Sequence, residues 1–306
     1  MPRTALTIGT FDAVHVGHAA IVAAARRAVG DEGSVIVLSF DPAPAAVLRQ
    51  DAKTGRLTTF QRRTELLRAA GANEVRPLVP TVELLGMEAE AFARDVVSET
   101  KADVLVEGEG FRFGRGRAGT MDSLRRLGAD QGWAAEEVSP VEVALGDHTV
   151  VRASSSLVRQ LLSLGRADDA ASVLGRPYRL EGQVVRGDRK GRDLGVPTAN
   201  LDAGDLMLPG DGIYAGHAQM EDGRVFPAAI SIGTKPTFDG RDRVCEAHII
   251  GYDGDLDWYD WHLQITVEHW IREQLRFSSG DALAEQMKRD IAEAGRMLAA
   301  EHGACG

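Results

Sequence analysis

The first half of the chain alternates between short apolar runs and longer amphipathic stretches. The apolar runs predict buried strands at residues 5–10, 34–40, 75–80 and 104–107. The amphipathic stretches predict helices at residues 19–29, 61–70 and 88–99. Strands that alternate with helices predict an α/β domain with a doubly wound parallel sheet, and ligands at the carboxyl ends of its strands.

The second half changes to closely spaced β patterns between turns rich in Gly and Asp. After predicted helices at residues 156–164 and 168–174, strands are predicted at residues 178–186, 212–219, 225–233, 245–250 and 263–270. Because no helices intervene, we expect a small antiparallel barrel, with an amphipathic helix at residues 280–301 packed outside it. Gly175-Arg176-Pro177 interrupts the pattern, so we expect domains at residues 1–175 and 176–306.

Composition limits the partners and the compartment. The 306 residues carry a net charge of −10, which disfavours nucleic acid and anionic membranes as partners. Cys245 and Cys305 match no metal spacing, no apolar run reaches the roughly 20 residues of a membrane span, and no signal peptide is recognisable. We therefore expect a cytoplasmic protein, whose oligomeric state the sequence does not indicate.

The segment from Gly187 to Asn200 combines glycines, basic residues and a closing Pro-Thr-Ala-Asn. Gly187 and Gly195 permit close approach of backbone N–H groups to an anion, and Arg192 adds positive charge. The side-chain oxygens of Thr198 and Asn200 are hard ligands suited to Mg2+ beside nucleotide phosphates. A turn-rich surface loop is the alternative interpretation.

A second glycine turn links the first predicted strand to the first predicted helix. It reads Gly9-Thr10-Phe11-Asp12-Ala13-Val14-His15-Val16-Gly17-His18, and a helix start of this kind favours an anion. His15 and His18 are three residues apart, so both imidazoles can approach phosphates and stabilise charge at the α-phosphorus. The alternatives are structural histidines or a metal-binding pair.

These segments resemble the two modules of bacterial bifunctional riboflavin kinase/FMN adenylyltransferases (FAD synthetases), over nearly the whole chain and in the same order. The Pro-Thr-Ala-Asn loop resembles the nucleotide and magnesium loop of the kinase, and His-x-Gly-His resembles the transferase signature. The resemblance implies phosphorylation of riboflavin to FMN by ATP with Mg2+. It also implies adenylylation of FMN to FAD with release of pyrophosphate.

The resemblance also implies roles for single residues. In the transferase, Gly9, Phe11, Asp12 and Ser155 would bind nucleotide, with His15, His18 and Arg159 acting on the triphosphate. In the kinase, Gly187, Arg192, Gly195, Thr198 and Asn200 would bind nucleotide, with Thr198 and Asn200 also holding the metal. Glu246 would be the base for the ribityl hydroxyl, and Arg272 and Phe277 would close over the flavin.

Simpler interpretations exist for several of these residues. Ser155 fits a helix cap, Glu246 an exposed strand glutamate and Phe277 a core aromatic.

Three departures from the family pattern concern the two sites. Ala43 replaces the usual His, Gly110 replaces Asn or Asp, and Asp257-Trp258 replaces Tyr-Gly near the flavin. The first two motivate an alternative function, a riboflavin kinase with a degenerate or redirected transferase. A flavin sensor without turnover is a third interpretation. The presence of Thr198, Asn200 and Glu246, the residues expected for catalysis, argues against it.

Overall fold

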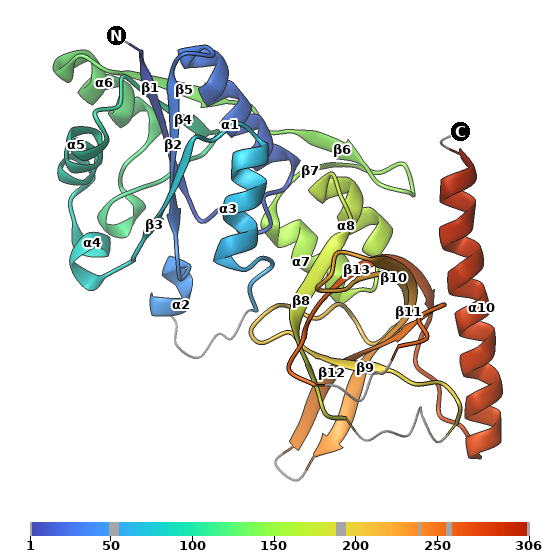
Figure 1. Ribbon diagram of the computed structural model, residues 1–306. Helices are drawn as coiled ribbons and strands as arrows, with labels where there is room; N and C mark the ends of the chain where they lie inside the picture. The colour runs from blue at the N-terminus through green and yellow to red at the C-terminus, as the bar shows by residue number, and fades with distance from the viewer. Residues whose placement is uncertain (1, 49–54, 188–193, 238–239, 255–258, 305–306) are drawn as a thin grey trace. The chain divides into compact units, whose positions relative to one another are not determined.

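The computed structural model describes residues 2–48, 55–187, 194–237, 240–254 and 259–304. The chain divides into two compact units, residues 1–144 with 149–155, and residues 145–148 with 156–306. Figure 1 shows their elements in chain order. The expected domain boundary after residue 175 stays a prediction.

The first unit contains a five-stranded parallel sheet in the order β3-β2-β1-β4-β5. Its strands are β1 (Thr4–Gly9), β2 (Ser34–Phe40), β3 (Glu74–Leu78), β4 (Val104–Gly108) and β5 (Ala134–Val138). The helices are α1 (Val16–Val29), α2 (Pro44–Leu48), α3 (Phe60–Ala69), α4 (Val82–Gly86), α5 (Ala89–Thr100) and α6 (Met121–Gln131). A hairpin of β6 (Glu142–Ala144) and β7 (Val150–Arg152) follows. The predicted doubly wound sheet is confirmed.

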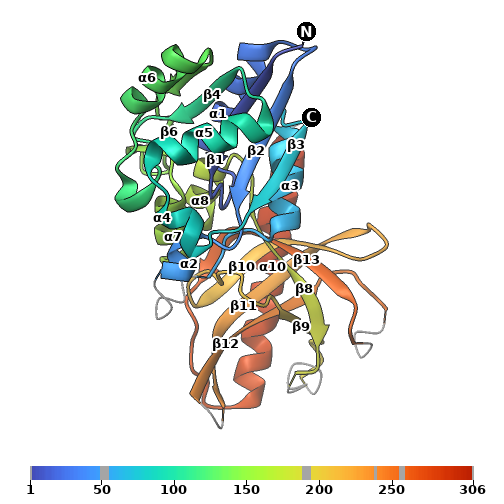
Figure 2. The same ribbon diagram turned by 90° about the vertical axis from the view of Figure 1, so that its left-hand side faces the viewer.

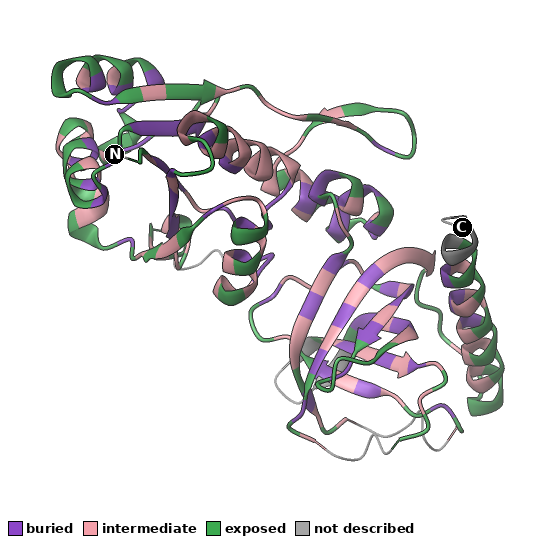
Figure 3. Cartoon of the chain, turned by 45° about the horizontal axis from the view of Figure 1, so that its top comes forward, coloured by how far each residue is buried: buried purple, intermediate pink, exposed green. Residues whose placement is uncertain are grey.

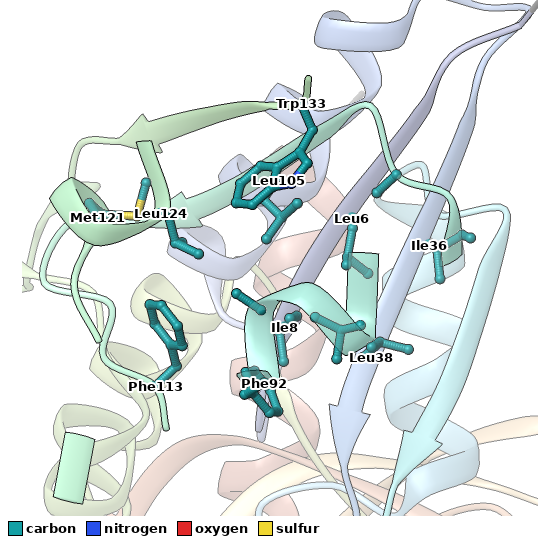
Figure 4. Close-up of a cluster of buried hydrophobic side chains, with 13 residues drawn as sticks. Leu6, Ile8, Ile36, Leu38, Phe92, Leu105, Phe113, Met121, Leu124 and Trp133 are labelled. Carbon is teal, nitrogen blue, oxygen red and sulfur yellow. The ribbon is translucent and has the colours of Figure 1, made fainter. Parts of the chain in front are cut away.

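Alternate residues of the central strands face opposite sides of this sheet. Leu6, Ile36 and Leu105 pack with α5 and α6 in the cluster that Figure 4 shows. Their neighbours in sequence join a second cluster with residues of α1 and α3. Because both faces are covered, the strands read as continuous apolar runs rather than as alternating patterns.

The second unit is a closed six-stranded barrel in the order β10-β11-β12-β9-β8-β13, preceded by two short helices. The helices are α7 (Ser155–Ser163) and α8 (Ala167–Leu174). The strands are β8 (Tyr178–Val185), β9 (Ala199–Asp202), β10 (Gly212–Gln219), β11 (Val225–Thr237), β12 (Gly240–Ile249) and β13 (His262–Arg272). Every pairing in the barrel is antiparallel, which confirms the predicted barrel (Figure 2).

The long helix α10 (Gly280–Ala304) packs outside the barrel, as predicted. Ala294 and Leu298 contact Ala215 of β10 and Ala229 of β11, and small residues let the helix approach the strands closely. The barrel strands alternate buried and partly buried residues (Figure 3). One set of side chains therefore fills the barrel, and the other is available for α10 and for ligands.

Candidate functional sites

His15 is the N-cap of α1. Its Nδ1 accepts hydrogen bonds from the backbone N–H groups of Gly17 at 3.1 Å and His18 at 3.4 Å. An imidazole that accepts at Nδ1 carries its proton at Nε2, which is then a donor. The His15 and His18 rings stack with centroids 3.7 Å apart, and His18 meets the edge of Phe11. The structure therefore brings together three residues of the predicted nucleotide turn.

The turn between β1 and α1 has an unusual backbone. Phe11, Ala13 and Val14 all have positive φ, at 49°, 79° and 45°. Such a conformation is strained for residues with a side chain, above all for a β-branched one, and such strain is typical of binding turns.

Buried hydrogen bonds hold this turn in place. Both carboxylate oxygens of Asp12 accept from Leu57 N–H at 3.0 Å, and Oδ1 also accepts from Thr58 N–H and its hydroxyl. The Ser155 hydroxyl donates to the Asp12 carbonyl at 2.7 Å. Asp12 thus serves to shape the turn, with its carboxylate engaged inside the protein.

A cavity of about 980 Å³ opens beside the turn, at the carboxyl ends of β1, β2 and β4. Gly9, Phe11 and His18 line it. Ala43 and Gly110, the two departures from the family pattern, line it as well. Gly110 has φ of 77° with open space around it, a conformation that Asn and Asp tolerate better than other side chains. Their positions support the expectation that both substitutions concern ligand binding.

Other lining residues were not predicted from the sequence as site residues. Phe111 and Phe113 stack at 5.6 Å, and Arg112 and Arg117 add exposed positive charge. The buried carboxyl of Glu107 lies at the end of β4. A charged residue that closes a buried apolar strand was a sequence signal for Glu107.

In the barrel, strand register brings the predicted kinase residues together. Asn200 of β9 lies directly opposite Glu246 of β12, and Glu246 lies opposite Ser231 of β11. Directly opposed residues point to the same face of the sheet about 5 Å apart. A Cβ atom at Gly187 would overlap the Asn200 amide, so a larger residue there would displace this side chain from its present position. The amide and the carboxylate therefore share one face.

The loop before β9 is anchored to the same face. The ring Nδ1 of His248 lies 2.8 Å from the Pro197 carbonyl oxygen, and Gly195 has φ of 75°. Thr198 follows directly, partly buried. Arg192, Asp257 and Trp258 lie outside the described residues. Within the described part of the chain, no group of three or more His, Cys, Asp or Glu side chains is arranged to hold a metal.

Arg272 and Phe277 lie together, because the Arg272 guanidinium is 6.0 Å from the Phe277 ring centroid. The guanidinium also makes two contacts with Asp290 of α10, Nε–Oδ1 at 2.9 Å and Nη2–Oδ2 at 2.6 Å. Gln274, which lies between Arg272 and Phe277 in the sequence, donates to the Ile232 carbonyl and the Ser231 hydroxyl. The predicted flavin-closing segment is therefore held by α10 at one point and by β11 at another.

The two folds, each with its own group of predicted site residues, are those expected of a two-module transferase with a nucleotide-binding sheet and a kinase-type barrel. The family model for FAD synthetase matches residues 1–152, and the model for riboflavin kinase matches residues 174–298. The chain is 34% identical to a bifunctional riboflavin kinase/FMN adenylyltransferase of Pseudomonas fluorescens over 297 residues, covering 96% of this chain and 92% of the relative. It is 33% identical to the protein of the same name in Escherichia coli K12, covering 93% and 90%.

The chain belongs to the family of bifunctional riboflavin kinase/FMN adenylyltransferases. The predicted function, ATP-dependent synthesis of FMN and then FAD, is confirmed over the kinase-only alternative, since both domains are present.

A crystal structure described as a macrolide-efflux protein from Streptococcus pneumoniae shares the fold, with a TM-score of 0.84, 26% identity and coverage of 95% and 93%. That description concerns the other protein. In the described residues of this chain, no helix has the length and apolar character needed to cross a membrane.

Proposed function

We propose that the barrel phosphorylates riboflavin at the face shared by Asn200 and Glu246. The carboxylate of Glu246 accepts the proton of the ribityl hydroxyl as the hydroxyl attacks the γ-phosphate of ATP, and the bond from the γ-phosphorus to the bridging oxygen breaks to release ADP. The observation that carries this proposal is the strand register that sets Asn200 opposite Glu246. The side-chain amide of Asn200 packs closely against Gly187.

Thr198 and Asn200 fit a Mg2+ ion in the donor chemistry that they offer. Both supply neutral hard oxygens, and Mg2+ usually takes few protein ligands together with substrate phosphates. Bound there, the ion would neutralise charge on the transferred phosphate. Open space surrounds Gly195. The contact between the His248 ring and the Pro197 carbonyl fixes the loop that carries Thr198.

The sheet unit adenylylates FMN in the cavity beside the β1–α1 turn. The Nε2–H group of His15, set by its capping role, donates to a phosphate oxygen. His18 acts beside it, and Asp12 and Ser155 hold the turn. The role of Arg159 as the cation for the triphosphate rests on the family resemblance and stays a prediction. We also propose a cytoplasmic, reducing setting, which suits the free, buried thiol of Cys245.

Two variants separate the activities. Glu246→Gln should abolish FMN formation from riboflavin, yet still convert FMN to FAD. His15→Asn retains a side chain that caps helices well but lacks Nε2–H, so it should lose FAD formation and retain the kinase. Loss of both activities in either variant, with the protein folded, would contradict this division of labour.

A further inference from the structure

Glu107 is the penultimate residue of β4 and lies beyond the point where β1 and β4 stop pairing. The ladder between these strands pairs Ala5 with Val104 and Leu6 with Leu105, and goes no further. By contrast, β1 stays paired with β2 as far as Gly9. Glu107 Oε1 accepts the Ile8 N–H at 2.7 Å, in place of a backbone partner. This gap is the switch point of the sheet order, where ligands of such folds bind.

The second carboxyl oxygen of Glu107 makes a longer and weaker contact than the first. Oε2 lies 3.5 Å from the Thr7 hydroxyl, the long limit of a hydrogen bond. The residue is 2% exposed, and this burial raises the pKa of its carboxyl well above the ordinary value. A carboxyl that keeps its proton has an O–H group to donate.

The cavity that Glu107 lines is otherwise rich in aromatic residues. Phe11, Phe40, Phe92, Phe111 and Phe113 all line it. Pockets of this kind bind flat apolar ring systems, and a few polar groups fix their orientation. Glu109 of the same lining is half-exposed and paired with Arg152, whereas Glu107 is buried.

We propose that Glu107 is a specificity-determining residue of adenylyl transfer, which donates a hydrogen bond from Oε2 to an acceptor on a planar heterocycle in this cavity. The inference rests on the proposed function of the sheet unit. The adenine of ATP and the ring system of FMN both offer such acceptors, and the kinetics distinguish them.

The test uses Glu107→Met and Glu107→Gln in the full chain, with Glu136→Met as control. Glu136 is an exposed carboxylate on the neighbouring strand β5, outside the cavity lining. Methionine removes both hydrogen bonds, whereas glutamine retains an acceptor for Ile8 and a donor for the ring. We expect Glu107→Met to raise the KM for either ATP or FMN about tenfold, and Glu107→Gln to restore it to within about threefold.

The substrate whose KM rises identifies the ring. A purely structural role would lower the active fraction, and hence the apparent kcat, without changing either KM. Wild-type KM values for both substrates in Glu107→Met would overturn the inference. If that variant does not fold, the wild-type enzyme is assayed instead with deaza analogues of ATP and FMN and with thio analogues of FMN. KM values equal to those of ATP and FMN for every analogue would overturn the inference. A wild-type chain that makes no FAD would instead refute the proposed function.

Discussion

Replacing Asp290 of α10 by alanine tests how much its ion pair with Arg272 stabilises the flavin-closing segment of the kinase. Its carboxylate meets the Arg272 guanidinium at two points and also accepts from Gln286 at 2.9 Å. The two ionic side chains are only 18% and 7% exposed. Asp290→Ala would leave a largely buried guanidinium without its carboxylate. Removing one partner of a buried pair costs about 3–5 kcal/mol, and the partial exposure of Arg272 reduces our expectation to about 2–4 kcal/mol.

Denaturant unfolding followed by tryptophan fluorescence measures this loss. Among the described tryptophans, Trp261 and Trp270 lie in the barrel unit and Trp133 lies in the sheet unit, so emission reports mainly on the barrel. Heating should show a midpoint lower by roughly 4–16 °C, at about 2–4 °C per kcal/mol for a unit of this size. Since Arg272 lies beside Phe277, the KM for riboflavin should also rise, while FMN adenylylation stays unchanged.

Glu285→Ala is the matched control on the same helix. Its pair with Lys288 is more than 60% exposed at both side chains, so its loss should cost less than about 1 kcal/mol. Equal midpoints for Asp290→Ala and Glu285→Ala would refute the reasoning, because they would show that the buried pair contributes no more than an exposed one.

Three further predictions concern other parts of the chain. Gly187→Ala should lower kinase kcat/KM by about tenfold or more by displacing Asn200, with FAD formation from FMN as the unaffected internal control. Burial raises the pKa of the Cys245 thiol to about 12, so native protein at pH 8 should leave this thiol unalkylated in peptide mass spectra. Because the folded pKa of Glu107 is raised, its protonated carboxyl favours folding fully below pH 4.5, and this contribution is lost as pH rises toward the folded pKa. Hydrogen exchange of β1 and β4 amides should therefore show wild type losing protection relative to Glu107→Gln as pH rises, and a pH-independent difference would contradict this.

Long apolar runs made much of the fold predictable. The bounds expected for residues 34–40 and 212–219 coincide with β2 and β10. The strand β5 was missed, because its Ala-Ala-Glu-Glu-Val sequence lies at the sheet edge and has no apolar run. The strand β9 was missed because its four residues follow directly from the Pro-Thr-Ala-Asn loop.

The site was predictable as residue types, but not as contacts. Glycine turns and the His-x-Gly-His motif indicate an anion site from local sequence alone. The pairing of Asn200 with Glu246 depends on register between strands far apart in the chain, which local patterns do not fix. Likewise, the ion pair between Arg272 and Asp290 depends on where α10 packs against the barrel. Asp12 is a further example, since its carboxylate accepts hydrogen bonds from the backbone of Leu57 and Thr58, which are distant in sequence.

The most direct test of the central claim is a time course of the wild-type chain with riboflavin, ATP and Mg2+, with products separated by chromatography. A chain with both activities produces FMN first and then converts it to FAD, with one pyrophosphate released for each FAD. Accumulation of FMN without FAD would contradict the account of the sheet unit, and would mark Ala43 and Gly110 as the substitutions that disabled it. Riboflavin left unphosphorylated would contradict the account of the barrel.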